Sequence, residues 1–582
     1  MKTKWLITLM AVAMILFVMA CDDVSASEDN TLESVQEQDA TVTEESGMMV
    51  KIAGEMYSVE ATAIEIELNG TLTGKDIENL HSIEKLRTLQ IVYSELSDIS
   101  FLKDFPELTE LYLYNNEITD LTPLAGLTNL TSLSLGDNEI TDLTPLAGLT
   151  NLTYLSLSGN EITDLIPLTG LTNLTDLSLA GNEITDLTPL AGLTNLTSLS
   201  LTDNEVTDLT PLAGLTNLTS LSLTDNEITD LTPLAGLTNL TSLLLANNKI
   251  TDVKQLVGLV NLTQLVLGGN QISDISSLSE LTGLTSLVLG DNDIVDISSL
   301  SDMINLEMLS LYENDISDIT PLAGLINLEK LRLNDNKISD ISSLSGMIKL
   351  EDLTLAKNEV SDITPLVGMV NLKDLSLYGN QIVDISSLAN MTSLEELDLS
   401  KNQIVNICSL SNMRKLTSLY LDGNMITDIT PLETLTNLTE LHISNNEITN
   451  IDALAGLNNL KKIWAGDNHI TDITSGSTPI VGLLGLEELL LPNNNISDLT
   501  PLIALSNLEE LDVSGNDVTD LSPLAGLTNL EELNVSENVN ISDVSPLYEL
   551  SNLQRLEIDS DCMTWMEKIA LKVELPQCTV EN

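Results

Sequence analysis

A 22-residue repeat runs through most of this chain, and no other feature limits its fold so strongly. An asparagine recurs every 22 residues from Asn116 to Asn468, and the pattern resumes at Asn494, Asn516 and Asn538. Periods of this length are typical of solenoids, in which one repeat forms one coil that cannot bury its apolar side chains without a neighbouring coil. The chain is therefore expected to fold as one elongated stack of coils.

Each repeat starts with a short strand. In residues 127–148, Leu133 and Leu135 have strand spacing and are predicted to point inward, whereas Ser134 between them points outward. Asp142 is placed to cap a helical or 3₁₀ turn that begins at Thr144 and Pro145. The predicted fold is an α/β-type repeat solenoid: an arc with a parallel concave β-sheet and short 3₁₀, helical or extended segments on its convex side.

The repeated asparagine is expected to stabilise the turn after each strand. Its amide can both donate to and accept from backbone groups that the turn leaves unpaired, so these side chains should stack into a ladder. The first predicted members of this ladder are Asn116, Asn138, Asn160, Asn182, Asn204, Asn226, Asn248 and Asn270. Methionines at the Leu127-type position, such as Met303 and Met347, are predicted to be core residues.

The repeated phrase NEITDLTPLAGLTNLTSLSL resembles the leucine-rich repeats of the internalin family of bacterial surface proteins. The resemblance covers roughly residues 64–560. It implies a leucine-rich repeat horseshoe. Internalins use the concave strand face to bind host-cell proteins, so the resemblance also implies a binding face of that kind here.

The amino-terminal segment has the composition of an export signal. Lys2 and Lys4 precede an apolar run that ends at Ala20, and Cys21 follows. The ending Val-Met-Ala-Cys resembles the bacterial lipobox, whose cysteine becomes the acylated first residue of a lipoprotein. Residues 1–20 are therefore predicted to be a signal peptide, and Cys21 a lipidation site that anchors the protein on the outer side of a bacterial membrane. The alternative is cleavage elsewhere, with Cys21 incidental.

Composition divides the rest of the chain. Residues 21–47 are rich in acidic and hydroxyl side chains, which predicts a disordered tether. Residues 48–84 carry a degenerate repeat and are expected to form an N-terminal cap, and residues 85–560 the solenoid. Residues 561–582 contain an amphipathic segment that is expected to cover the last coil, where Cys562 and Cys578 are predicted to form a disulfide. Cys408 replaces a repeated serine and is expected to be largely buried.

The chain carries a net charge of −64, with 87 acidic and 23 basic residues. This charge argues against nucleic acid and anionic membrane surfaces as partners. The repeated aspartates are interpreted as caps, with a row of weak Ca²⁺ sites as the alternative; no other cofactor is expected. His81, His442 and His469 form no local constellation with Cys, Ser or Asp, so no catalytic or metal-binding residue is predicted and the protein is not expected to be an enzyme.

A candidate ligand-binding patch lies in the later repeats. The outward strand position is serine in the early repeats but Tyr420, His442 and Trp464 on three successive coils, which should place three rings side by side about 5 Å apart. Aromatic side chains are enriched in binding hot spots; the alternative is mutual packing of a few exposed rings. The predicted patch comprises Tyr378, Tyr420, Asp422, Glu440, His442 and Trp464, with Lys330 and Arg332 adding attraction for an acidic group on the partner.

The favoured function is that of a membrane-tethered, monomeric extracellular protein that binds a protein, peptide or glycan through its concave face. The alternative function is a structural or adhesive spacer without a single high-affinity ligand.

Overall fold

The structure, a computed structural model, describes residues 49–53, 55–67, 72–83, 85–473, 480, 482–538 and 540–581. The described residues from Val50 onward belong to one structural unit. The predicted signal peptide, Cys21 and the acidic tether lie outside the described residues. Most of residues 475–482, which lengthen one repeat, also lie outside them.

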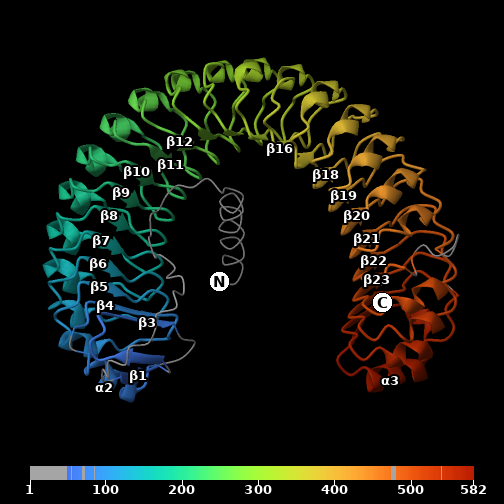
Figure 1. The fold of residues 1–582 in the computed structure, drawn as a ribbon, viewed down its shortest axis with the longest axis horizontal. Helices are drawn as coiled ribbons and strands as arrows, with labels where there is room; N and C mark the ends of the chain where they lie inside the picture. The colour runs from blue at the N-terminus through green and yellow to red at the C-terminus, as the bar shows by residue number, and fades with distance from the viewer. Residues whose placement is uncertain are drawn as a thin grey trace, which may run out of the picture. The chain divides into compact units, whose positions relative to one another are not determined.

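A parallel sheet of 24 strands forms the concave side of this unit (Figure 1). Its strands pair in chain order, and the register is shifted by one repeat, so that Leu133 lies beside Leu155. Among the described strands, the first strand β3 pairs only with β4 and the last strand β26 only with β25, so the sheet is an open arc, as predicted. The strands are β3 (Ala63–Glu67), β4 (Thr88–Val92), β5 (Glu110–Tyr112), β6 (Ser132–Ser134), β7 (Tyr154–Ser156), β8 (Asp176–Ser178), β9 (Ser198–Ser200), β10 (Ser220–Ser222), β11 (Ser242–Leu244), β12 (Gln264–Val266), β13 (Ser286–Val288), β14 (Met308–Ser310), β15 (Lys330–Arg332), β16 (Asp352–Thr354), β17 (Asp374–Ser376), β18 (Glu396–Asp398), β19 (Ser418–Tyr420), β20 (Glu440–His442), β21 (Lys462–Trp464), β22 (Glu488–Leu490), β23 (Glu510–Asp512), β24 (Glu532–Asn534), β25 (Arg555–Glu557) and β26 (Thr579–Glu581).

Short 3₁₀ helices line the convex side (Figure 1). Most of them begin where Thr-Pro, Ser-Pro or Ser-Ser follows a buried aliphatic residue of the repeat. Their bounds are η1 (Ser100–Asp104), η2 (Thr122–Leu124), η3 (Thr144–Gly148), η4 (Ile166–Gly170), η5 (Thr188–Gly192), η6 (Thr210–Gly214), η7 (Thr232–Gly236), η8 (Lys254–Gly258), η9 (Ser276–Glu280), η10 (Ser298–Leu300), η11 (Thr320–Gly324), η12 (Ser342–Leu344), η13 (Thr364–Gly368), η14 (Ser386–Asn390), η15 (Cys408–Asn412), η16 (Thr430–Thr434), η17 (Asp452–Leu454), η18 (Thr500–Ala504), η19 (Ser522–Leu524), η20 (Ser545–Glu549) and η21 (Ser560–Cys562).

The core lies between the sheet and these 3₁₀ helices. Leu133 and Leu135 are fully buried, as predicted, and so are Met303 and Met347. The buried set of the same coil continues through Ile140, Leu143, Leu146 and Leu149. Because every coil offers the same aliphatic positions, the core is one continuous column that no single repeat could build.

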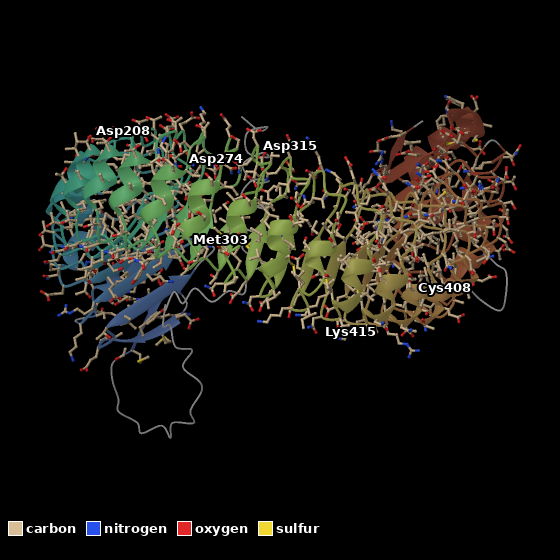
Figure 2. The ribbon with its side chains drawn as sticks, turned by 90° about the horizontal axis from the view of Figure 1, so that it is seen from above. Asp208, Asp274, Met303, Asp315, Cys408 and Lys415 are labelled. Carbon is tan, nitrogen blue, oxygen red and sulfur yellow. The ribbon has the colours of Figure 1, made fainter. Side chains whose placement is uncertain are left out.

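The repeated aspartate caps the convex turn, as predicted. The backbone N–H of Thr144 donates to Asp142 Oδ1 at 2.8 Å. Hydrogen bonds from the Thr144 side chain and backbone lower the pKa of Asp142 below its usual value. The equivalent Asp208 and Asp274 lie along one edge of the stack (Figure 2). The periodic acid therefore has an architectural role in each coil.

The asparagine ladder forms as predicted and links adjacent coils. The Asn138 Nδ2 donates to Leu135 O and Gly136 O of its own coil and to Leu113 O of the preceding one, at 3.0–3.1 Å. Its Oδ1 accepts from the backbone N–H of Ile118 at 2.9 Å. Each ladder amide thus satisfies buried backbone groups in two coils.

A second, exposed asparagine ladder was not predicted. The Nδ2 of Asn151 donates to Thr128 O at 2.8 Å, and Asn239 makes the same bond to Thr216 O. These asparagines belong to the repeated Asn-Leu-Thr triplets. The periodicity of this triplet could have predicted the second ladder, because a polar residue that recurs in successive coils usually bonds to the adjacent coil.

The amino-terminal end of the unit begins outside the main sheet. Strands β1 (Met49–Ile52) and β2 (Glu55–Ser58) form a separate two-stranded sheet, and helix α2 (Gly74–Leu80) follows β3. Thr73 and Asp76 form a capping box at the start of α2. The main sheet begins at β3, inside the predicted N-terminal cap, whose sequence carries a degenerate repeat.

The carboxyl-terminal end contains a helix where an amphipathic segment was predicted, but its two cysteines differ from the prediction. Helix α3 (Trp565–Glu574) buries Leu571 but leaves Trp565, Ile569 and Val573 exposed, so only a narrow face covers the last coil. Cys562 and Cys578 are free thiols, and the predicted disulfide is not formed.

The two thiols approach different carbonyl groups. Cys562 Sγ donates to Asn538 O at 3.7 Å, and Cys578 Sγ to Thr579 O at 3.6 Å. Burial raises the pKa of both thiols, which keeps them protonated and less reactive. The expectation for Cys408 was also wrong: this side chain is exposed, at the start of the convex 3₁₀ helix η15 (Figure 2).

Candidate functional site

Three rings lie side by side on the concave face, on strands β19, β20 and β21. Tyr420 lies in register with His442, and His442 with Trp464. The His442 ring stacks on the Trp464 ring with a centroid distance of 4.0 Å, and it meets the Tyr420 ring in a T-shaped contact at 4.7 Å. The predicted row is confirmed, and we call these three residues the aromatic ladder.

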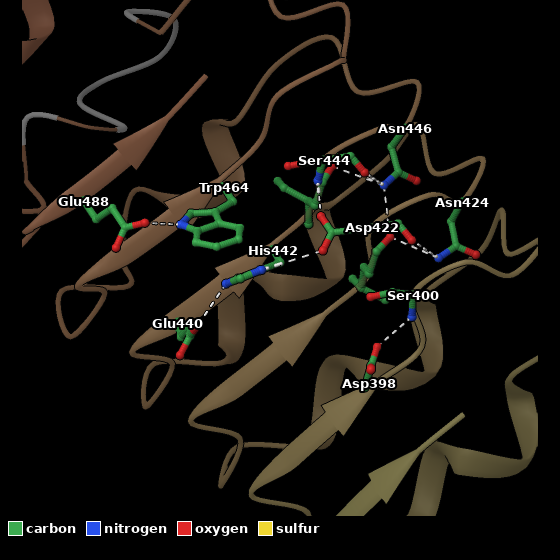
Figure 3. A network of polar contacts seen from close by, with 12 residues as sticks. Asp398, Ser400, Asp422, Asn424, Glu440, His442, Ser444, Asn446, Trp464 and Glu488 are labelled. Atoms are coloured by element: carbon green, nitrogen blue, oxygen red, sulfur yellow. Dashed lines mark hydrogen bonds and ion pairs between the residues drawn. The ribbon is translucent and has the colours of Figure 1, made fainter. Parts of the chain in front are cut away.

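His442 occupies the centre of the ladder and is only 7% exposed. Its Nε2 lies 2.9 Å from Glu440 Oε1, and its Nδ1 lies 3.7 Å from Asp422 Oδ2 (Figure 3). Burial lowers the pKa of His442, but the hydrogen bonds and charges of Asp422 and Glu440 outweigh burial and raise that pKa above its usual value. The ring is therefore a positioned support, and a partner would meet mainly the two half-buried rings on either side.

Trp464 and Tyr420 are held by polar contacts as well as by stacking. Trp464 Nε1 donates to Glu488 Oε1 on the next strand (Figure 3). Glu488 also pairs with Lys462 at 2.9 Å. Burial and the nearby charges of Glu440 and Glu396 raise the pKa of Tyr420 to about 12, so its hydroxyl stays a neutral donor.

The structural asparagine ladder holds the backbone beside these rings. Asn424 Nδ2 donates to Asp422 O at 3.4 Å, and Asn446 Nδ2 donates to Ser444 O at 3.1 Å (Figure 3). Asp422 Oδ1 in turn accepts from the Ser444 backbone N–H at 2.6 Å. These bonds fix the turn that follows strand β19, and Asp422 links this turn to the next coil.

The remaining predicted residues lie farther away. Tyr378 is on the second coil before Tyr420, and its ring carries Lys401 Nζ at 5.0 Å from the centroid. Lys330 and Arg332 are on β15, four strands from β19, and Arg332 lies 3.6 Å from Asp352. Because of this distance, Lys330 and Arg332 are not part of the cluster around the aromatic ladder. The charge of Arg332 is also already paired within the chain.

Three acidic residues next to the ladder were missed. Asp374 lies beside Glu396 on neighbouring strands, and Asp398 lies directly beside Tyr420. We call Asp374, Glu396 and Asp398 the acidic strip. The signal was available, because Asp398 occupies the outward column of Tyr420 and His442, and Asp374 and Glu396 occupy the column of the predicted Glu440.

Within the described part of the chain, no group of three or more His, Cys, Asp or Glu side chains could hold a metal ion. In the same residues, no helix is both long enough and apolar enough to cross a membrane.

The repeat geometry agrees with a sequence-family match. The profile described as Leucine Rich repeats (2 copies) matches eleven segments, from residues 106–148 to residues 485–526. The chain belongs to the leucine-rich repeat family. A comparison with curated proteins found no match.

Solved leucine-rich repeat structures resemble this one. The functional domain of InlJ from Listeria monocytogenes is 28% identical, with a TM-score of 0.52 over 60% of this chain and 75% of that one. The internalin InlF of the same species is 41% identical over 50% of this chain and 86% of that one, with a TM-score of 0.49. The likeness to InlJ supports the internalin-like character of these bacterial-type repeats.

A plant protein shares the same fold over a greater length. The leucine-rich repeat ectodomain of the Arabidopsis thaliana receptor kinase GASSHO1/SCHENGEN3 was solved in complex with CASPARIAN STRIP INTEGRITY FACTOR 2. It is 25% identical, with a TM-score of 0.70, over 84% of this chain and 63% of that one. The fold is therefore one that serves protein–protein interaction in a relative.

Proposed function

We propose that this leucine-rich repeat protein binds a protein or peptide partner on its concave face, with the aromatic ladder at the centre of the contact. The observation that carries the proposal is the change from serine to Tyr420, His442 and Trp464 in one outward column of the sheet. The fold does not need these rings, because the early coils stack equally well with serine there. Large half-buried rings on a polar surface are typical of binding hot spots.

The geometry of the ladder favours a partner over simple ring packing. His442 packs between its two neighbours and removes their freedom to rotate. Glu488 fixes the indole of Trp464 through a hydrogen bond. Rings that are already held in place lose little conformational entropy when a partner covers them, which strengthens binding.

The proposal includes export and a lipid anchor. Lys2 and Lys4, the apolar run to Ala20 and the lipobox-like ending at Cys21 support an anchor on the outer side of a bacterial membrane. An extracellular position agrees with the internalin and receptor-ectodomain relatives. Cys21→Ala should move the protein from the membrane fraction to the soluble fraction or block its processing. Wild-type protein that incorporates no labelled fatty acid would exclude the anchor.

The binding proposal is tested by capture followed by substitution. Partners are captured from the native surroundings with the wild-type protein, and the affinity of each is then measured for Trp464→Ala, Tyr420→Ala and Ser178→Ala. Truncating a hot-spot ring costs about 2 kcal/mol, which is roughly a thirtyfold weaker Kd. Ser178 has the same outward position on β8 and serves as the matched control.

Thermal unfolding of the same variants separates binding from folding. Trp464→Ala should keep the unfolding profile of the other coils, because each coil contacts only its neighbours. A captured partner that binds both ring variants as tightly as the wild type would place the binding site elsewhere.

A further inference from the structure

The acidic strip differs from the acidic residues on nearby strands of the concave face in its lack of ion pairs among the described residues. Asp352, on the preceding strand, is paired with Arg332 at 3.6 Å, and Glu488 with Lys462 at 2.9 Å. Farther along, Arg555 lies 3.7 Å from Glu532. Among the described residues, by contrast, no Lys, Arg or His forms an ion pair with Asp374, Glu396 or Asp398.

Crowding raises the electrostatic cost of these carboxylates. Desolvation raises the pKa of Asp374 and Glu396, and the charges of neighbouring acids add to it. At Asp374 the charges of Lys373 and Lys330 offset this rise only in part. Desolvation also raises the pKa of Asp398, although its Oδ1 accepts from the backbone N–H of Ser400 at 2.9 Å. The charge of a positive group placed between these residues would favour the ionised carboxylates and so offset both effects.

The strip and the ladder form one continuous surface. Asp398 lies in register with Tyr420, and Glu396 with Ser418, so carboxylates on β18 adjoin the first ring of the ladder on β19. Adjacent strands are about 4.8 Å apart, which places a carboxylate and the aromatic ring within reach of one cationic side chain. A guanidinium group can bond carboxylates with its edge while it stacks on a tyrosine ring with its face.

The geometry points to a positively charged polypeptide segment as the partner of this surface, with an arginine seated on the acidic strip against Tyr420. This inference rests on the proposed function and specifies the chemistry of its partner. Charge complementarity selects the occupant, since the strip carboxylates form no ion pair among the described residues, whereas Asp352 and Glu440 on nearby strands are paired with Arg332 and His442. The remaining rings of the ladder then meet apolar or aromatic side chains that flank the arginine.

The test uses a labelled peptide and two variants of equal charge. The full-length protein is titrated with a fluorescein-labelled peptide of four Arg-Ser-Gly triplets at about 150 mM salt, where long-range charge effects are largely screened. The strip variant carries Asp374→Asn, Glu396→Gln and Asp398→Asn; the amide oxygen at position 398 can still accept from Ser400. The control variant carries Glu161→Gln, Glu183→Gln and Glu205→Gln, which are exposed residues on early coils.

The strip variant should bind the peptide about tenfold or more weakly than wild type, whereas the control variant should stay within about twofold. A peptide with lysine in place of arginine should bind wild type more weakly. Equal weakening in both variants would reduce the effect to general charge attraction and overturn the inference, as would unchanged binding in the strip variant.

The outcomes also separate this inference from the proposed function. A captured partner that loses affinity for Trp464→Ala but binds the strip variant as tightly as wild type leaves the proposed function standing and refutes the cationic partner. The opposite result is that the peptide needs the strip, while no captured partner loses affinity for Trp464→Ala or Tyr420→Ala. This result supports the site for a cationic segment and refutes the aromatic ladder as the centre of the contact.

Discussion

Asn248→Ala provides a stringent test of how the coils are held together. Asn248 Nδ2 donates to Leu223 O at 2.9 Å, to Leu245 O at 3.2 Å and to Ala246 O at 3.0 Å. Its Oδ1 accepts from the buried N–H of Ile228 at 3.0 Å. The substitution removes all four hydrogen bonds at once. The three carbonyl oxygens and the one N–H that lose a partner differ in whether another partner remains.

The three carbonyl oxygens keep other donors after the substitution. Leu223 O still accepts from Asn226 at 3.2 Å, Leu245 O from Asn270 at 3.0 Å, and Ala246 O from the Asp225 backbone N–H at 2.9 Å. The Ile228 N–H alone has no second acceptor among the described contacts. An orphaned buried N–H costs about 1–3 kcal/mol and the weakened donor side adds about 1 kcal/mol, so we expect a loss of about 3 kcal/mol.

The matched control is Asn239→Ala in the second ladder. That residue is exposed and makes one side-chain bond, to Thr216 O at 2.8 Å, so its loss should cost less than about 1 kcal/mol. Because the stability of a solenoid is local, the assay is hydrogen exchange resolved at Ile228, supported by urea unfolding. Asn248→Ala should speed exchange at that amide by roughly a hundredfold. Similar effects of the two substitutions, or full protection of Ile228, would refute the reasoning.

Two further predictions concern pH and the candidate site. The folded-state pKa of His442 is raised, so its contribution to the free energy of unfolding is fully present below its usual pKa of 6.5 and is lost as pH rises through the folded value. His442→Gln should therefore flatten the change in melting temperature between about pH 5.5 and 8. An unchanged slope would contradict the raised pKa of His442. The pKa values of the acidic strip are raised, so its charged carboxylates destabilise the fold as pH rises. The strip variant should therefore have a higher melting temperature than wild type at pH 7 but not at pH 4. A lower melting temperature of the variant at pH 7 would show instead that these carboxylates stabilise the coils.

Much of the fold could be predicted because each fold-determining residue recurs at a fixed place. The strand leucines, the capping aspartate and the ladder asparagine repeat with the coil, and a periodic residue in a solenoid must meet the same neighbour in every coil. The predicted burial of Leu133 and Met303 and the capping by Asp142 followed from that rule and are confirmed.

The ends of the stack were predicted less well because periodicity stops there. The amphipathic pattern predicted a segment over the last coil but did not show which of its apolar residues are buried. Within α3, Leu571 is buried, whereas Trp565, Ile569 and Val573 are exposed. The spacing of Cys562 and Cys578 says nothing about the direction in which each thiol points, and the structure directs them to separate carbonyl groups. Exposed Cys408 shows the same limit, because a serine-like position in the repeat does not determine burial.

The candidate site was partly predictable for the same physical reason. A column of outward positions shows which rings share a surface, so the row from Tyr420 to Trp464 could be predicted. It does not show which ring is covered by the others, and the burial of His442 depends on the side-chain conformations of both neighbours. Nor does a column show counter-charges, since the pairing of Arg332 with Asp352 depends on reach across strands.

The acidic strip links the electrostatics of the whole chain to its proposed function. With a net charge of −64, most carboxylates have to be tolerated, and the structure does so by capping, by solvent exposure or by pairing with one of 23 basic residues. Asp374 and Glu396 are exposed on the concave face but have neither a cap nor an ion pair among the described residues, although strands β9 and β10 carry serine in the same outward column. Groups that raise the energy of the free protein are those that a complementary partner can stabilise most, because binding then removes a cost as well as forming a contact. A cationic side chain between Asp398 and Tyr420 would lower the electrostatic cost of these carboxylates, whereas an anionic partner would raise it.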